Sequence, residues 1–143
     1  MDLFRALSIS ASGMTAQRTR MEVVTENLAN SDSAVTPTGK PYQRKLVLLR
    51  AVEGVAFRDA LKGADDPEGG VRVGGIVEAK DTPRRTHQPD HPHANAEGFV
   101  NMPNINPLRE MLDMMSSTRA YEANATAFQA TKSMGAKLLE LLR

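Results

Sequence analysis

Apolar side chains recur at a helical interval in the N-terminal segment of the chain. Five of them stand seven residues apart or at the companion offset of the same heptad: Leu7, Met14, Met21, Val24 and Leu28. This spacing places them in one stripe along a helix. The periodic pattern ends near Asn30, and asparagine tolerates the left-handed conformation that often follows a helix. The sequence therefore predicts a helix over residues 1–30.

A second helical segment begins more sharply, after two prolines. Pro103 and Pro107 disfavour helix in the residues before them, which predicts an extended Asn106 that caps a helix starting at Pro107. Apolar positions then recur at helical spacings, notably at Met111, Met114, Tyr121, Phe128, Leu138 and Leu142. This pattern predicts a helix over residues 106–143. The two helices would be about 40 and 55 Å long, which exceeds a compact domain of this size and favours a coiled coil.

The segment between them, residues 31–105, has the pattern of turns and short strands. It contains fifteen of the eighteen glycine and proline residues. Apolar or alternating runs predict four short strands, at residues 42–52, 71–73, 76–77 and 99–100. We interpret Gly74 and Gly75 as turn residues and residues 60–70 as a solvated loop. The predicted fold class is α+β, with the terminal helices paired as a coiled-coil hairpin and a small β-rich middle domain.

The composition excludes several functional classes. Among 143 residues, 18 lysines and arginines face 17 acidic residues, so no excess charge would attract nucleic acid or an anionic membrane. The absence of cysteine rules out disulfides, cysteine-ligated zinc and a thiol nucleophile. No apolar run approaches the roughly 18 residues that a membrane helix needs, so we expect no membrane insertion. The N-terminus also lacks the pattern of a cleavable secretory signal.

The strongest enzyme-like feature is the group formed by His87, His91 and His93. Three imidazoles at this spacing could converge on a metal ion. Pro89 and Pro92 interrupt any regular element that would place the rings, so loop histidines without a metal are the favoured interpretation. The serines near the N-terminus lack the flanking glycines of a nucleophile turn, and the glycine pairs lack a phosphate-loop or dinucleotide pattern. We therefore predict no catalytic, metal or cofactor site.

Methionine gives the most informative clue to function. Six of the eight methionines fall in the two helical segments, where flexible thioethers fill irregular gaps between unlike neighbours. Helices this long cannot be covered by a middle segment that holds only three of the six aromatic residues of the chain. Each helix must bury its stripe against the other, and the remaining apolar surface against another molecule. The pattern predicts an assembly subunit, with the heptad positions named above as packing residues.

Six short segments then appear in the order found in one known family. The first helix ends in Asn27-Leu28-Ala29-Asn30, and the second contains Arg119, Tyr121, Glu122 and Asn124 in the run Arg-Ala-Tyr-Glu-Ala-Asn. Between them stand further motifs at residues 37–42, 70–73, 91–94 and 98–106. Together these segments resemble the flagellar basal-body rod proteins, and the short length is most similar to the proximal members. Phe99 departs from the tyrosine more often found there.

This resemblance implies a structural subunit of the bacterial flagellar rod, the drive shaft that carries torque across the periplasm to the hook. It also implies uncleaved export through the flagellar type III apparatus. The expected partners are other rod proteins, the adaptor at the rod base, the inner-membrane ring and further copies of the chain. We expect Asn27, Asn30 and Asn124 to cap or hydrogen-bond where helix meets middle domain. We also predict that the free termini are largely disordered before assembly.

Two other classes compete with this interpretation. A small metal-dependent enzyme would need stoichiometric metal and would lose activity when His91 or His93 is changed. A cytosolic coiled-coil adaptor would be well folded as a monomer or closed dimer and would not be secreted. Recovery of the intact protein from purified basal bodies would distinguish the three classes.

Overall fold

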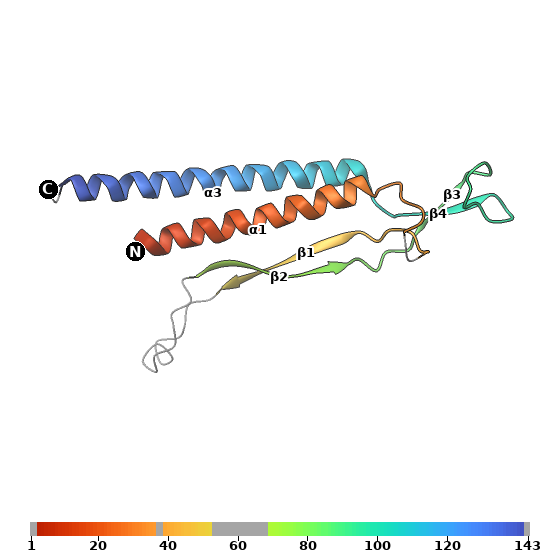
Figure 1. Ribbon diagram of the computed structural model, residues 1–143, viewed down its shortest axis with the longest axis horizontal. Coiled ribbons are helices and arrows are strands. Elements are labelled where there is room, and N and C mark those ends of the chain that lie inside the picture. The colour runs from red at the N-terminus through yellow and green to blue at the C-terminus, as the bar shows by residue number, and fades with distance from the viewer. Residues whose placement is uncertain (1–2, 37–38, 53–68, 142–143) are drawn as a thin grey trace, which may run out of the picture.

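Two long helices dominate the computed structural model, which describes residues 3–36, 39–52 and 69–141. The elements follow in the order α1 (Leu3–Ala29), β1 (Lys45–Val52), β2 (Gly70–Glu78), β3 (Arg84–His87), β4 (Phe99–Met102) and α3 (Pro107–Leu141). Figure 1 shows α1 and α3 side by side and antiparallel, the β1–β2 ribbon along α1, and β3–β4 beyond the helices. The predicted α+β class is confirmed.

The helix boundaries lie close to those predicted. Asn106 caps α3, because its Oδ1 accepts hydrogen bonds from the Leu108 and Arg109 amides at 3.0 and 3.4 Å. The reason given for the end of α1 is wrong, since no residue other than glycine has a positive φ in the described part of the chain. Instead, the Asn30 side chain donates to the Glu26 carbonyl at 2.9 Å, which satisfies one of the last free carbonyls of α1.

The two helices contact each other from end to end. Leu3 lies against Gly135, Gly13 against Asn124, and the Thr118 hydroxyl donates to the Met21 Sδ at 3.4 Å. A Cβ on Gly13 would stand only 2.9 Å from the Asn124 Oδ1. Glycine is therefore needed here for the close approach of the helices rather than for an unusual backbone angle.

The ribbon differs from the prediction in one respect. Gly74 and Gly75 form no turn, because β2 continues through them as one strand antiparallel to β1, with Lys45 opposite Glu78 and Val52 opposite Gly70. The register skips Gly74, which makes it the extra residue of a β-bulge. A continuous ladder to the eight residues of β1 outweighs the weak strand propensity of the glycines.

Two further differences from the prediction concern where β1 begins and the presence of β3. β1 begins at Lys45, since Tyr42 turns toward the helices instead of extending the strand. β3 was not predicted, because its sequence is polar and gains its ladder only by pairing with β4. Most of the predicted loop at residues 60–70 lies outside the described residues.

Buried side chains gather where the helices meet the middle of the chain. The small apolar core contains Ala34, Val100 and Met102. Among the largest fully buried side chains, however, are those of Asn27, Glu110 and Ser117. The centre of the molecule is therefore polar, and such groups are stable only when they are hydrogen-bonded or paired.

Candidate assembly site: the polar junction and the exposed apolar surfaces

The end of α1, the start of β1 and the first turns of α3 meet in a cluster of polar side chains. We call this cluster the polar junction; its members are Asn27, Tyr42, Arg44, Glu110 and Asp113. Glu110 is 0% exposed and Asn27 is 1% exposed. Three segments far apart in the sequence are thus joined by hydrogen bonds and ion pairs rather than by aliphatic packing.

Asn27 is the centre of the polar junction. Its Oδ1 accepts hydrogen bonds from the Lys45 amide at 2.8 Å and from the Tyr42 hydroxyl at 3.0 Å. Its Nδ2 donates to the Lys45 carbonyl at 2.9 Å and to Glu110 Oε2 at 3.1 Å. Because the amide pairs with both backbone groups of Lys45, it acts like a neighbouring strand and fixes the start of β1 against α1.

The charge of Glu110 is balanced by Arg44. Arg44 Nε donates to Glu110 Oε1 at 2.6 Å, and its terminal nitrogen lies 3.4 Å from Asp113 Oδ2. Arg20 of α1 approaches Asp113 Oδ1 at 3.3 Å. A carboxylate buried this completely is tolerated because a guanidinium and an amide replace the lost water.

Tyr42 is held in its neutral form by its surroundings. Burial raises the pKa of Tyr42 to about 12, and the nearby carboxylates of Glu26, Glu78 and Glu110 add to the shift. The hydroxyl therefore stays protonated at physiological pH and donates a hydrogen bond to Asn27 Oδ1. The hydrogen bonds and ion pairs of the polar junction are those of a structural joint between α1, β1 and α3.

The three asparagines singled out from the sequence occupy different places. Asn27 lies in the polar junction as predicted. Asn30 closes the turn after α1, where it also accepts a hydrogen bond from the Ser33 hydroxyl at 3.2 Å. The predicted place is wrong for Asn124, which lies halfway along α3 beside Gly13 and donates to the Ala120 carbonyl at 2.8 Å.

The predicted packing residues divide between a buried side and an exposed side. Val24 is buried, and six others are half-buried: Leu7, Met14, Met21, Leu28, Met114 and Phe128. Three on α3 are exposed: Met111 (48%), Tyr121 (36%) and Leu138 (56%). Leu142 lies outside the described residues. The motif residues Ala29, Arg119 and Glu122 are also exposed.

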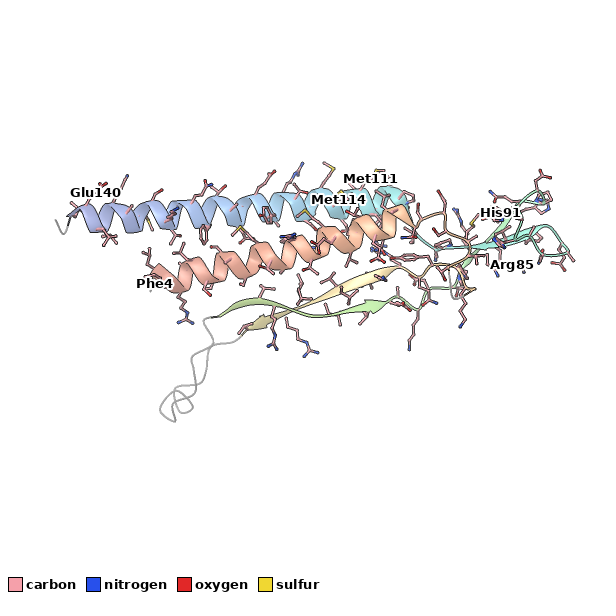
Figure 2. The ribbon with its side chains drawn as sticks, in the orientation of Figure 1. Phe4, Arg85, His91, Met111, Met114 and Glu140 are labelled. Atoms are coloured by element: carbon pink, nitrogen blue, oxygen red, sulfur yellow. The ribbon has the colours of Figure 1, made fainter. Side chains whose placement is uncertain are left out.

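Apart from Tyr121, the large exposed apolar residues of α3 form two groups toward opposite ends of the helix. We call the first the base patch; it contains Leu108, Met111, Leu112 and Met115. We call the second the tip patch; it contains Met134, Leu138, Leu139 and Leu141. Figure 2 marks Met111 on the side of α3 away from α1. The tip patch borders an apolar groove of about 420 Å³, also lined by Leu3.

The histidines and serines considered as candidate site residues make packing contacts and hydrogen bonds within the chain. The His87 ring packs edge-on against Phe99, with ring centres 5.1 Å apart, and His91 Nδ1 accepts from the His93 amide at 3.2 Å. The Ser12 hydroxyl accepts from the Val71 amide at 3.2 Å and so ties α1 to β2. Across residues 3–36, 39–52 and 69–141, no three histidine or acidic side chains form a group able to hold a metal ion.

Neither helix has the length and hydropathy together that would let it cross a membrane, as far as the described residues extend.

Reasoning from sequence alone missed Arg44 and Glu110 as partners. The two residues are 66 positions apart, and each looks like an ordinary surface charge. The inward side of α3 also carries Ser117, Thr118 and Asn124, so a glutamate on it did not stand out from the pattern. Nothing in the local pattern identified which arginine would pair with it.

Comparisons with known proteins converge on one family. A family model described as flagella basal body rod protein matches residues 7–35, and one described as the C-terminal part of flagellar basal body rod FlgEFG proteins matches residues 96–141. The flagellar basal-body rod protein FlgC of Bacillus subtilis is 45% identical over 149 aligned residues, which cover 99% of both chains.

Two further relatives carry the same name. The FlgC of Aquifex aeolicus is 41% identical over 142 residues, covering 98% of this chain and 97% of that protein. The FlgC of Escherichia coli O157:H7 is 37% identical over 141 residues, covering 99% and 98%.

Proposed function

The chain belongs to the flagellar basal-body rod proteins, among their FlgC members, and we propose that its two helices polymerise with those of neighbouring subunits into a hollow helical shaft. It is a structural, non-enzymatic subunit of the basal-body rod. In the proposed arrangement, α1 and α3 form a coiled-coil hairpin at the inner wall of the shaft. The middle domain then lies outside.

The observation that carries this proposal is apolar surface that the helix pair leaves uncovered. Although α1 and α3 pack along their length, the base patch and the tip patch remain exposed, with Leu112 at 59% and Leu139 at 70%. Contiguous apolar patches of this kind are typical of interfaces. Because the patches lie at opposite ends of α3, they favour head-to-tail contacts, which generate open helices rather than closed dimers.

The proposal extends to location and partners. The rod spans the periplasm, and the chain reaches it through the flagellar type III apparatus without cleavage. Other rod proteins, the rod-base adaptor, the inner-membrane ring and further copies of this chain are the proposed neighbours. Torque passes through many interlocked subunits. Each subunit is divided into three functional segments, at residues 1–30, 31–105 and 106–143.

A charge introduced into the base patch tests the assembly surface. Leu112→Glu should lower recovery of the chain in purified basal bodies by about tenfold or more, because a buried carboxylate without a partner opposes the contact. Gln129→Glu is the matched control, since it adds the same charge at an exposed position of the same helix. Normal recovery of the Leu112 variant would refute the proposed surface.

A second test concerns the state before assembly. Without a neighbouring subunit, the helix ends that lie far from the polar junction gain too few contacts to offset about 1 to 2 kcal/mol of backbone entropy per residue. Amides of the first and last ten residues should therefore exchange rapidly in the isolated monomer and slowly in assembled rods. Strong protection of both ends in the monomer would contradict the proposal and favour a self-contained adaptor.

A further inference from the structure

The outer face of the β1–β2 ribbon is separate from the helix surfaces discussed above. We call it the ribbon face; its residues are Leu46, Leu48, Arg50, Arg72 and Val77. The register places Leu46 opposite Val77 and Arg50 opposite Arg72, and alternate residues of a strand share a face. All five are exposed, with Leu48 at 44% and Val77 at 40%.

The opposite face of the ribbon is covered only in part within the chain, because Leu49 and Ile76 on that face remain 38% and 51% exposed. Val47, Val71 and Val73 are half-buried, and the Val71 amide bonds to Ser12 of α1. Figure 1 shows the ribbon running beside α1. A two-stranded ribbon with aliphatic side chains on both faces, one of them only partly covered, has apolar surface left for another molecule.

Arg50 and Arg72 are directly opposite each other on adjacent strands. Like charges at such positions destabilise a ladder, because the side chains lie within about 5 Å at Cβ. Within the described ranges no carboxylate forms an ion pair with either arginine, whereas Arg18, Arg20 and Arg44 each have at least one. The pair thus places two positive charges, unpaired among the described residues, beside an aliphatic surface.

The β-bulge gives Arg50 a defined position on this face. A Cβ on Gly74 would lie 3.1 Å from the Arg50 Nε and 3.2 Å from its Cγ and Cδ. The side chain therefore lies flat across Gly74, with its aliphatic part against the backbone and its guanidinium at the surface. Bulges commonly redirect a side chain in this way, so the glycine contributes to the shape of the surface.

We propose that the ribbon face binds an acidic, aliphatic segment of a different protein around the rod. Carboxylates of that segment pair with Arg50 and Arg72, while its aliphatic side chains cover Leu46, Leu48 and Val77. A free inorganic anion would neutralise the arginines but would leave the aliphatic residues uncovered. Paired charge beside apolar surface matches a polypeptide partner, for which charge complementarity gives specificity.

The first experiment identifies the occupant inside intact basal bodies. A photo-crosslinking amino acid replaces Leu48 in the full chain, and the linked peptide is identified by mass spectrometry. The expected product is a peptide of another protein that carries at least two carboxylates next to aliphatic residues. A link to a second copy of this chain, a link to lipid, or no link would overturn the proposal.

Charge reversal then separates binding from folding. Arg50→Glu places opposite charges across the ladder, so the ribbon should become more stable, yet cross-linking from position 48 should fall about tenfold. Arg84→Glu on β3 is the matched control, because Arg84 is exposed and has no ion pair within the described residues. Its cross-linking yield should equal that of the unchanged chain.

Recovery in basal bodies is measured on the same samples and used to normalise the yield. The ribbon face is distinct from the base and tip patches, so the Arg50 variant should enter the rod normally. An unchanged normalised yield in this variant would overturn the proposed docking, while leaving the assembly proposal for the helices intact.

Discussion

The helix pair and the polar junction are held together by opposite means. Along their length, α1 and α3 meet through small or flexible residues such as Gly13 and Met21, and much of the apolar surface of α3 stays exposed. At the polar junction, fully buried Asn27 and Glu110 satisfy each other and the backbone of β1. The junction is complete within one chain, whereas the helix pair leaves apolar surface that the proposed assembly would cover.

The largest expected effect comes from breaking the polar junction. Glu110→Ala leaves the buried Arg44 guanidinium without its main partner and should cost about 3 to 5 kcal/mol of unfolding free energy. Urea denaturation of the isolated chain, followed by exchange of the β1 amides, measures the loss. Glu110→Gln keeps the shape and one hydrogen bond, so it should cost less. A loss below about 1 kcal/mol for the alanine variant would show that the junction does not order the monomer.

A smaller effect is expected from the helix pair, and in a different assay. Phe128→Ala and Leu28→Ala each remove a half-buried side chain, which should cost about 2 kcal/mol at such sites. Because the proposed shaft is built from the helix pair, the loss should appear as fewer intact basal bodies and reduced motility. Protection of the β1 amides in the monomer should change little. Normal basal bodies in both variants would remove the helix pair from the assembly mechanism.

Tyr42→Phe removes one hydrogen bond at the junction and should cost about 1 kcal/mol near neutral pH. The pH dependence of the stabilisation by Tyr42 is a more specific test. The folded pKa of about 12 exceeds the usual value of 10.0, so the folded state holds this proton more tightly. The stabilisation is complete below pH 10 and is lost as the pH rises toward 12. Unfolding titrations should show this loss in the parent chain and not in the phenylalanine variant.

The smallest net effect is expected at the close approach of the helices. Gly13→Ala gains helix propensity but places a Cβ 2.9 Å from the Asn124 Oδ1. The two terms oppose each other, so the single variant should change stability by less than about 1 kcal/mol. Combining it with Asn124→Ala removes the clash, and a double-mutant cycle should reveal coupling between the sites. Strict additivity would show that the helices do not approach this closely in solution.

The sequence by itself determined the two helices and the class of function. The Asn106 cap with Pro107 fixed the start of α3, and heptad spacing fixed the extent of α1, because both signals are local to the backbone. The motif order from Asn27 to Asn124 identified the family. The strand β3 and the continuity of β2 escaped prediction, since strand pairing depends on a partner distant in sequence.

Which polar residues lie at the centre of the molecule depends on how the chain folds back on itself. Glu110 and Arg44 look like surface charges in the sequence, and they become a buried pair because the antiparallel helices bring the first turns of α3 to the end of α1. Arg50 and Arg72 become neighbours only through the register of the ribbon. Electrostatic energy depends on separation in space and on burial, and neither is encoded at any single position of the chain.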